Sequence, residues 1–238
     1  MTMRLQKFLA HSGICSRRKA EKYIQQGRIK VNDKIVVELG TKIVPGEDKI
    51  LFDNNQIFLN LEKENIYIAL NKPVGFISSC SRSHKKEKIV LDLVDIKERI
   101  YPVGRLDKDS EGLILLTDDG ALHNKLSHPS FDHEKEYEVS TGIPISGGAL
   151  KKLEKGMMLR GTKTRPAKIR RLSPQRFCIT LQEGKNRQIR RMVRKVGGHV
   201  TGLKRLRMAN IRLGRLPEGG WRYLSENERE RLLKSVLK

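Results

Sequence analysis

Long hydrophobic runs are missing from this 238-residue sequence, and both cysteine and acidic residues are scarce in it. No apolar run reaches the roughly 18 residues that a transmembrane helix needs, which excludes a helical membrane-spanning protein. The apolar stretch near the N-terminus is too short for a signal peptide. The three cysteines, Cys15, Cys80 and Cys178, are scattered and odd in number, so we expect a reducing cytoplasm rather than a disulfide framework.

The pattern of cysteine and histidine also argues against a metal site. No Cys-x-x-Cys pair occurs, and His123, His128 and His133 recur every five residues. A helix brings residues three or four positions apart onto one face, so this spacing does not gather the imidazoles. The ligand spacings known for zinc are absent as well. The sequence therefore predicts no bound metal.

Basic residues are abundant where acidic ones are scarce. The chain has 49 Lys and Arg against 27 Asp and Glu, a formal net charge of +22. From Lys163 to Arg215 there are 17 Lys or Arg and one acid, Glu183, so this segment alone contributes +16. Such a surface favours a polyanionic partner. Because no long amphipathic helix of the membrane-surface type occurs, a nucleic acid is favoured over a membrane.

One carboxylate, Asp107, lies in a short polar turn between Pro102 and the apolar run Leu113–Leu116. Gly104 and Gly112 lie on either side of this turn and allow the chain to bend sharply. An acid in a loop beside a rigid strand, within a strongly basic protein, indicates chemistry on a nucleic acid. An ordinary surface turn is the alternative, because Asp, Gly and Ser are the commonest turn residues.

A second informative segment runs from Glu183 to Gly198. Gly184 breaks the preceding strand, and Asn186 is expected to cap a helix. The apolar residues that follow fall at i, i+3, i+4 and i+7 and form one helical stripe: Ile189, Met192, Val193 and Val196. The start of this helix carries four cations that favour an anion site together with the helix dipole: Lys185, Arg187, Arg190 and Arg191. The alternative is that Arg190 only solvates the helix face.

Residues 1 to about 60 are typical of a small α+β module. Leu5, Phe8 and Leu9 predict a helix, and Ser16 is expected to cap a second one. A strand–turn–strand pattern follows at 29–37. The basic residues of the two helices avoid the apolar positions and form a surface suited to a phosphate backbone: Arg4, Lys7, Arg17, Arg18, Lys19 and Lys22. Two solvated helix faces are the alternative.

The rest of the chain alternates strands and helices without a repeated βαβ spacing, which favours an α+β fold with a mixed sheet over a doubly wound one. A polar stretch at 60–65 is the expected linker, and the basic loop at 78–88 either becomes ordered on RNA or is a solvated connection. The expected elements are strands at 66–70, 113–116, 135–139 and 177–181, a short helix at 122–126, and a helix at 147–158 that ends near Gly156.

The segment Gly104-Arg-Leu-Asp107, followed by Gly112-Leu-Ile-Leu-Leu-Thr-Asp-Asp-Gly120, resembles the signature motif of the RNA pseudouridine synthases. More narrowly, it resembles the RsuA/RluB/RluE/RluF branch, which modifies bacterial ribosomal RNA. The resemblance implies an isomerase that converts uridine to pseudouridine, with Asp107 as its catalytic aspartate. It also implies that residues 66–238 form a mixed, mainly antiparallel sheet with flanking helices.

Further residues match motifs of the same family, and they complete an expected catalytic set of Asp107, Tyr137 and Arg190. The resemblance implies that Arg190 pairs with Asp107 and keeps its carboxylate ionised. Ile189 is implied to line the floor of the base pocket, where the ring of Tyr137 stacks on the flipped uracil. Arg105 is implied to occupy the space that the uridine leaves. The other expected RNA contacts of this domain are Lys72, Lys185, Arg187 and Arg191.

Three segments of the N-terminal module carry a second resemblance: Arg4-Leu-Gln-Lys-Phe-Leu-Ala, Ser16-Arg-Arg-Lys-Ala-Glu and Gly27-Arg-Ile-Lys-Val-Asn32. They are similar to the RNA-binding module named after ribosomal protein S-four, which would occupy residues 1–61. The resemblance implies that the module faces RNA with Arg4, Lys7, Arg17 and Arg18.

The sequence thus predicts a pseudouridine synthase that works without cofactor or metal. Three segments look closer to the enzymes of 23S ribosomal RNA than to the 16S enzyme: His128-Pro129, 134–137 and 216–221. We expect a monomer that meets this RNA in a pre-ribosomal particle in the cytoplasm, away from any membrane. The alternatives are 16S rRNA or tRNA as substrate and a non-catalytic assembly factor. A nucleic-acid hydrolase would need a divalent metal held by Asp107 with Asp109, Asp118 or Asp119.

Overall fold

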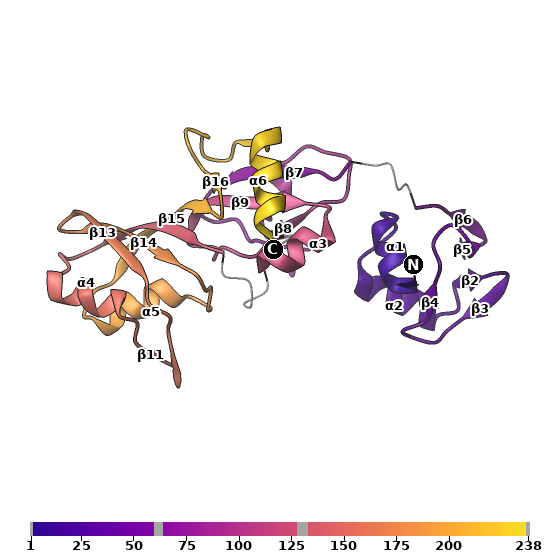
Figure 1. The fold of residues 1–238 in the computed structure, drawn as a ribbon, viewed down its shortest axis with the longest axis horizontal. Helices are drawn as coiled ribbons and strands as arrows, with labels where there is room; N and C mark the ends of the chain where they lie inside the picture. The colour runs from indigo at the N-terminus through magenta and orange to yellow at the C-terminus, as the bar shows by residue number, and fades with distance from the viewer. Residues whose placement is uncertain (1, 60–63, 128–132, 237–238) are drawn as a thin grey trace. The chain divides into compact units, whose positions relative to one another are not determined.

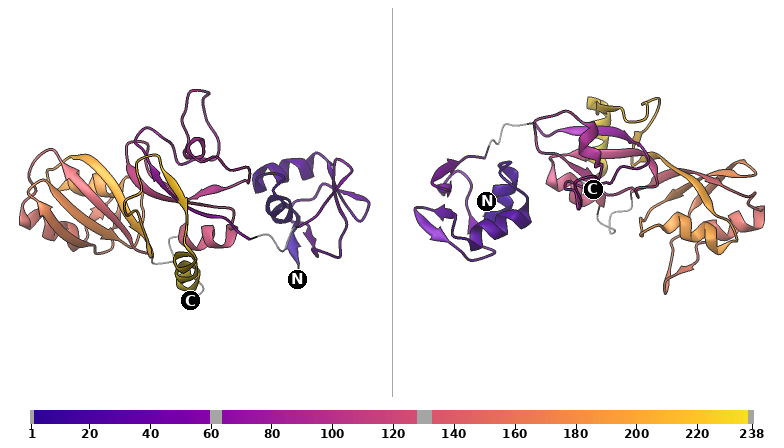
Figure 2. Two further views of the ribbon diagram at one scale, coloured as in Figure 1. Left: turned by 90° about the horizontal axis from the view of Figure 1, so that it is seen from above. Right: turned by 180° about the vertical axis from the view of Figure 1, so that it is seen from behind.

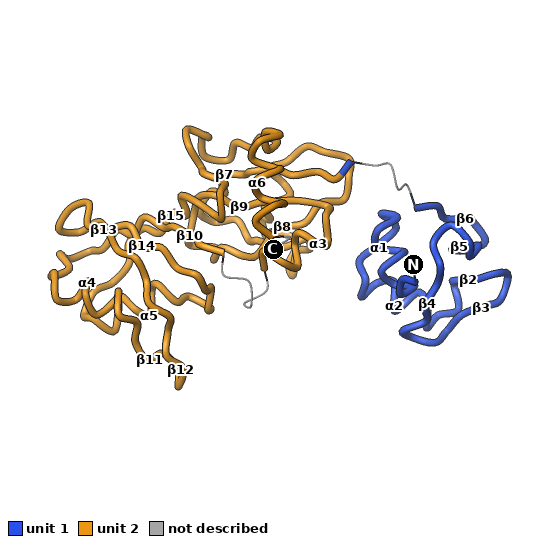
Figure 3. The backbone as a smooth tube through the Cα atoms, in the orientation of Figure 1, with its two compact units in different colours: residues 1–64 blue, residues 65–238 orange. Residues whose placement is uncertain are grey.

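The computed structural model describes residues 2–59, 64–127 and 133–236. The chain divides into two compact units, residues 1–64 and residues 65–238, drawn in blue and orange in Figure 3. Most of the predicted linker at 60–65 lies outside the described residues, as does the pair His128-Pro129. None of the helices in the described ranges is long and apolar enough to cross a membrane.

In unit 1, two helices and several short strands enclose one hydrophobic core. Ser16 caps the second helix as predicted, because its Oγ accepts a hydrogen bond from the backbone N–H of Lys19. Asn32 and Asp33 both have positive φ, which suits a two-residue hairpin turn. The elements are α1 (Leu5–His11), α2 (Arg17–Gln25), a sheet in the order β3 (Lys34–Val36), β2 (Ile29–Val31), β5 (Ile50–Phe52) and β6 (Asn55–Ile57), and the strand pair β1 (Met3–Arg4) and β4 (Lys42–Ile43).

Unit 2 is built on one sheet of nine strands within residues 64–127 and 133–236 (Figure 1). Its pairs are antiparallel except for β15 with β9, so the sheet is mixed and mainly antiparallel, as predicted. The central order is β13 (Lys168–Ser173), β14 (Arg176–Leu181), β10 (Lys135–Thr141), β15 (Val200–Met208), β9 (Glu111–Thr117), β7 (Tyr67–Lys72) and β17 (Trp221–Tyr223), with β16 (Ile211–Arg212) paired to β15 and β8 (Tyr101–Val103) to β9.

Both faces of this sheet are covered, which explains the uninterrupted apolar run Leu113–Leu116. Alternate residues of a strand point to opposite faces, and in β9 Ile114 and Leu116 enter one core whereas Leu113 and Leu115 enter the other. Figures 1 and 2 show the covering helices, which are α4 (Gly147–Glu154), α5 (Gln188–Lys195) and the short 3-10 helix η1 (Val90–Leu93) over the first core, and α3 (Gly120–Ser127) and α6 (Glu226–Val236) over the second.

Several element boundaries differ from the predicted ones. Strand β7 runs on to Lys72 instead of ending at residue 70, and α4 ends at Glu154, two residues before the positive-φ Gly156. Helix α5 begins at Gln188, and its N-cap is Arg187 rather than Asn186. The small hairpin of β11 (Met158–Leu159) and β12 (Thr162–Lys163) has no apolar alternation that would have predicted it.

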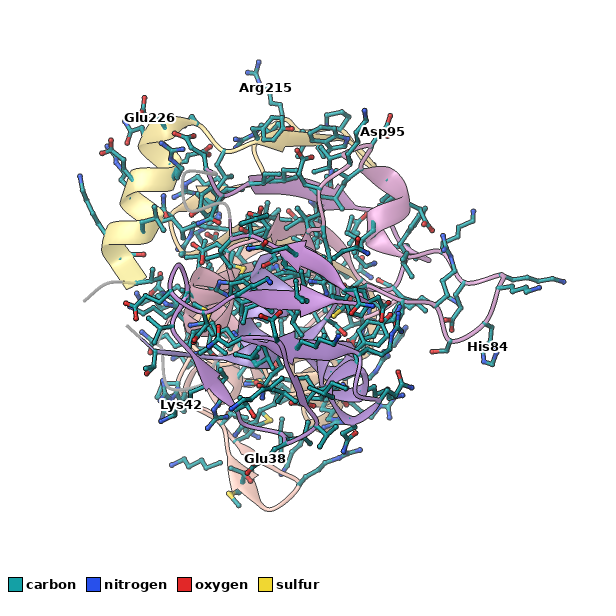
Figure 4. The ribbon with its side chains drawn as sticks, turned by 90° about the vertical axis from the view of Figure 1, so that its right-hand side faces the viewer. Glu38, Lys42, His84, Asp95, Arg215 and Glu226 are labelled. Atoms are coloured by element: carbon teal, nitrogen blue, oxygen red, sulfur yellow. The ribbon has the colours of Figure 1, made fainter. Side chains whose placement is uncertain are left out.

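The basic loop at 78–88 lies outside both cores. Figure 4 shows His84 at the outer end of this loop, and Figure 2 shows the loop extending away from the sheet. Its bends are held by polar contacts instead of packing, because the Glu87 side chain accepts a hydrogen bond from the Ser83 amide, and the Glu87 carbonyl accepts one from Arg82. Ser78 is the one buried side chain of the loop, and the prediction that the loop does not pack as core is confirmed for residues 79–88.

Gly112 at the start of β9 gives a stability prediction. Its φ is +100°, and a Cβ added there would lie 2.6 Å from the backbone nitrogen of Arg205 on the neighbouring strand β15. Gly112→Ala therefore combines backbone strain with steric overlap, and we expect it to lower the unfolding free energy by about 2–6 kcal/mol. Urea unfolding followed by the fluorescence of Trp221, the one tryptophan, reports on unit 2.

Gly214→Ala is the matched control. Gly214 also has a positive φ, +59°, but an added Cβ would meet nothing within 4 Å. Backbone strain alone predicts a loss of about 1–2 kcal/mol for this variant. Equal losses for the two variants would show that the close approach of β15 is not what requires a glycine at position 112.

Candidate active site

Asp107 lies in the turn that joins β8 to β9, and we call residues 104–110 the aspartate turn. Both flanking glycines, which were expected to let the chain bend sharply, have positive φ, +71° at Gly104 and +100° at Gly112. The turn is closed by a hydrogen bond of 3.1 Å from the Ser110 N–H to the Asp107 carbonyl. It therefore presents Asp107, whose side chain is 30% exposed, at the end of a strand buried on both faces.

The segment after β7 holds the aspartate turn through its main chain. The N–H of Gly75 donates to the carbonyl of Lys108 at 2.7 Å. The hydroxyl of Ser78 donates to the carbonyl of Leu106 at 3.0 Å and accepts from the Leu106 N–H at 3.1 Å. These bonds leave the side chains of the turn's two aspartates free for other contacts.

Lys72 at the end of β7 is fully buried. Its ammonium donates to the carbonyl of Ser110 at 2.6 Å and to that of Pro73 at 2.8 Å. Burial lowers the pKa of Lys72 to about 8, although the charges of nearby Asp109 and Asp107 oppose this shift. The prediction that Lys72 contacts RNA is wrong for this structure, because its ammonium faces the aspartate turn and has no exposed surface.

Arg190 of α5 also holds this turn. Its Nη2 donates to the carbonyl of Asp109 at 2.7 Å and to the Ser110 hydroxyl at 3.3 Å. Its Nη1 donates to the carbonyl of Val200 on β15 at 3.2 Å. The direct Arg190–Asp107 ion pair that the resemblance implied is not formed among the described residues. The guanidinium bonds two main-chain carbonyls and the Ser110 hydroxyl instead.

The cation beside Asp107 is Arg187. This N-cap residue of α5 has a left-handed backbone, φ +50°. Its Nη1 lies 3.8 Å from Oδ2 of Asp107, and its two terminal nitrogens donate to the two carboxylate oxygens of Asp109 at 3.0 and 2.9 Å. The hydrogen bonds from Arg187 lower the pKa of Asp109 below its usual value.

A cavity of about 270 Å³ opens beside the aspartate turn. Asp107 lies at its edge, and the nearly buried side chains of Tyr137 on β10 and Ile189 on α5 line it. Leu181 and Leu203 add further apolar wall. Many polar and charged side chains line the rest of the cavity, so it suits one flat heterocycle that carries hydrogen-bonding groups, beside a carboxylate.

Two polar residues to which the sequence analysis gave no role in the site also line the cavity. Gln188 accepts a hydrogen bond from the Lys185 N–H at 3.0 Å, so it orders the start of α5 in place of Asn186. Its amide donates to Glu183 at 2.6 Å. The sequence held a signal for this role. Glu183 is the one acidic residue of the segment from Lys163 to Arg215, which has 17 Lys or Arg.

The remaining predicted RNA contacts are surface residues. Arg105 and Lys185 line the cavity and are exposed, and Arg191 donates to the side chain of Asn186 at 2.7 Å. In unit 1, Arg4, Arg17 and Arg18 are exposed and Lys7 is partly buried, so all four reach solvent as the predicted basic surface requires. Their contact with RNA stays a prediction.

The carboxylates do not form a metal site. Asp118 and Asp119 follow the far end of the seven-residue strand β9, about 20 Å from the aspartate turn at ~3.3 Å per residue. Asp118 accepts from the Ile66 N–H and Asp119 from the Tyr67 hydroxyl. Among the described residues, no group of three or more His, Cys, Asp or Glu could hold a metal ion.

Comparisons with known proteins cover both units. Residues 66–195 match the family model described as RNA pseudouridylate synthase, and residues 3–49 match the S4 domain. A solved structure titled "Crystal structure of pseudouridylate synthase" superposes with a TM-score of 0.70 at 32% identity, over 97% of this chain and 99% of that one.

Two curated relatives match nearly the whole chain. The "Ribosomal large subunit pseudouridine synthase B" of Bacillus subtilis is 44% identical over 96% of this chain and 95% of its own length. The "Dual-specificity RNA pseudouridine synthase RluF" of Escherichia coli K12 is 40% identical over 99% of this chain and 80% of its own length. With a family model over more than half of its length and relatives of this similarity, the chain belongs to the RNA pseudouridylate synthase family.

Proposed function

We propose that this pseudouridine synthase isomerises a specific uridine of 23S ribosomal RNA, with Asp107 as its catalytic residue. The observation that carries the proposal is the cavity that brings Asp107 together with Tyr137 and Ile189. The Bacillus relative, named for the large ribosomal subunit, supports 23S rRNA as the substrate.

The reaction needs no second substrate, because the uracil that leaves the ribose is the group that rejoins it. The bond between N1 of uracil and C1′ of the ribose breaks, the base turns within the cavity, and C5 bonds to C1′. The hydrogen of C5 is released as a proton to water, and N1 gains a proton, so the product is an isomer of the substrate. Asp107 serves as the nucleophile at the sugar or as a base, and both roles use an ionised carboxylate.

The uridine must leave its stack to reach Asp107. Base flipping costs a few kcal/mol. Stacking on the ring of Tyr137 returns about 1–3 kcal/mol, and the exposed Arg105 at the cavity mouth fills the space that the base leaves. Ile189 and two leucines offer the flipped base an apolar surface to pack against.

The substrate proposal extends to the setting of the reaction. We place it in the cytoplasm, where a single copy of the chain acts on 23S rRNA in a pre-ribosomal particle. The segments 134–137 and 216–221 support 23S over 16S rRNA by their similarity to the 23S enzymes. Because the Escherichia coli relative is named a dual-specificity enzyme, 16S rRNA and tRNA belong in the same assay.

Asp107→Asn is the direct test of the catalytic residue. The amide is nearly isosteric but cannot act as nucleophile or base, so we expect turnover to fall by about 10⁴-fold or more, while RNA affinity stays equal or rises slightly. Tritium release from 5-tritiated uridine in 23S rRNA measures turnover, because C5 loses its hydrogen in this reaction.

Asp95→Asn is the control. Asp95 is exposed, lies in the same unit and carries the same charge, but it does not line the cavity (Figure 4). Substantial turnover by the Asp107 variant would remove Asp107 from its proposed role. Tritium release from 16S rRNA or tRNA but not from 23S rRNA would contradict the proposed substrate and leave the proposed reaction unchanged.

The S4 domain gives a separate prediction about binding. Replacing Arg17 and Arg18 by alanine should reduce the slope of log affinity for 23S rRNA against log salt concentration by about 0.7–0.9 per lost phosphate contact. The matched control replaces Lys34 and Lys42, two exposed lysines of the same unit that lie outside α1 and α2. Equal slopes for the two double variants would show that the helix surface is not a specific RNA contact.

A further inference from the structure

A second cavity, of about 110 Å³, adjoins the first. The two cavities share four of their described lining residues: Arg105, Tyr137, Glu183 and Gly184. Two cations line the second cavity alone, Lys135 on β10 and Arg205 on β15. Neither of them belongs to the expected catalytic set or to the expected RNA contacts.

The sheet places both cations beside Tyr137. Arg205 is the partner of Tyr137 where β10 pairs with β15, and Lys135 lies two positions before Tyr137 on the same strand. Residues opposite each other on paired strands, and residues two apart along one strand, share a face of the sheet. Both cations therefore reach a cavity that the ring of Tyr137 also lines.

The guanidinium of Arg205 has an unused donor. Arg205 is 1% exposed, and its Nε donates to the carbonyl of Leu113 at 2.6 Å. Its buried Nη2 has no hydrogen-bond partner among the described residues. An unpaired buried donor on a charged group costs free energy, so a ligand that accepts a hydrogen bond there is favoured.

Lys135 has no acidic partner within residues 2–59, 64–127 and 133–236 either. Its ammonium donates one long hydrogen bond, of 3.4 Å, to the carbonyl of His133. Burial lowers the pKa of Lys135, and the positive charge of Arg205 lowers it further. The two cations thus repel each other in the free protein.

The acids on either side of Lys135 in the sequence bond other cations. Glu134 pairs with Lys168 at 2.7 Å and with Arg207 at 2.9 Å. Glu136 pairs with Arg207 at 3.1 Å. Both carboxylates are therefore already compensated and are not directed to Lys135.

Glu183 is the one acid among the described residues that line the second cavity. Its Oε1 accepts from the Gln188 amide at 2.6 Å and from the Arg165 N–H at 3.1 Å, and its Oε2 lies 3.4 Å from the ammonium of Lys185. Three cations line the cavity against this acid: Arg105, Lys135 and Arg205. The cavity thus has an excess of positive charge and favours a compact anion.

We propose that Lys135 and Arg205 bind one phosphate group of the RNA backbone, beside the uridine that enters the first cavity. The two free oxygens of a phosphodiester can accept from one cation each. The second cavity has less than half the volume of the first, about 110 Å³ against about 270 Å³, which suits a phosphate rather than another base. The inference rests on the proposed function and adds a contact that fixes the position of the flipped nucleotide.

Binding tests use Lys135→Gln and Lys135→Arg in the full chain, with Lys204→Gln as the matched control. Lys204 precedes Arg205 on β15 but does not line the cavity. We expect Lys135→Gln to weaken 23S rRNA binding about tenfold and to lower the slope of log affinity against log salt by about 0.7–0.9, the loss of one phosphate contact. Lys135→Arg keeps the charge and should retain most of the affinity. Equal losses for Lys135→Gln and Lys204→Gln would overturn the proposal.

Ethylation of single phosphates in 23S rRNA locates the contact, because it removes one backbone charge at a time. For the wild-type protein we expect ethylation to block binding at a phosphate that flanks the uridine converted to pseudouridine. For Lys135→Gln this block should disappear, while the other blocked positions remain. An identical pattern for both proteins would overturn the proposal. If Lys135→Gln also lost binding of inorganic phosphate, that pattern would assign the cavity to a free anion.

Urea unfolding followed by Trp221 fluorescence separates binding from a role in folding. Because Lys135 and Arg205 repel each other, Lys135→Gln should leave the unfolding midpoint of the free protein unchanged or raise it. A lower midpoint, with the same loss of RNA affinity in Lys135→Arg, would show that this lysine supports the fold and would overturn the proposal. Absence of pseudouridine from every RNA tested would instead count against the proposed function, because the ethylation pattern of binding does not depend on turnover.

Discussion

The ammonium of Lys72 is the contact on which the geometry of the site depends most. It is buried between β7 and the aspartate turn and donates to two backbone carbonyls, those of Pro73 and Ser110. Carbonyls left without a donor in this position would cost about 1–3 kcal/mol each, so the turn is bound firmly to the sheet. Burial lowers the pKa of this ammonium, and the charges of the turn's two aspartates oppose that shift.

Holding the turn by its main chain has a chemical consequence. Lys72, Ser78 and Arg190 reach it from different elements, and each bonds a backbone carbonyl of the turn. The carboxylate of Asp107 is therefore not needed to hold the loop and remains available for the reaction.

How much of the structure could be predicted from the sequence depends on how far apart in the chain the interacting residues lie. Local signals were reliable: Ser16 caps α2, Gly104 and Gly112 have positive φ, and the stripe of α5 is buried at Ile189, Met192 and Val193. Long-range contacts were not predictable. The burial of Lys72 depends on a turn 38 residues away, and Arg187 is held beside Asp107 by hydrogen bonds to Asp109, 78 residues away.

Residue-resolved amide hydrogen exchange in Lys72→Met tests the central claim most directly. Methionine fills much of the space but donates no hydrogen bond, so the turn should open more often than it does in the wild-type protein. The account predicts that the amides of Gly75, Leu106 and Ser110, which are bonded within or to the turn, exchange about tenfold faster or more, while that of Ile114 in β9 is unchanged. Unchanged exchange at all four positions, or equal acceleration at all four, would contradict it.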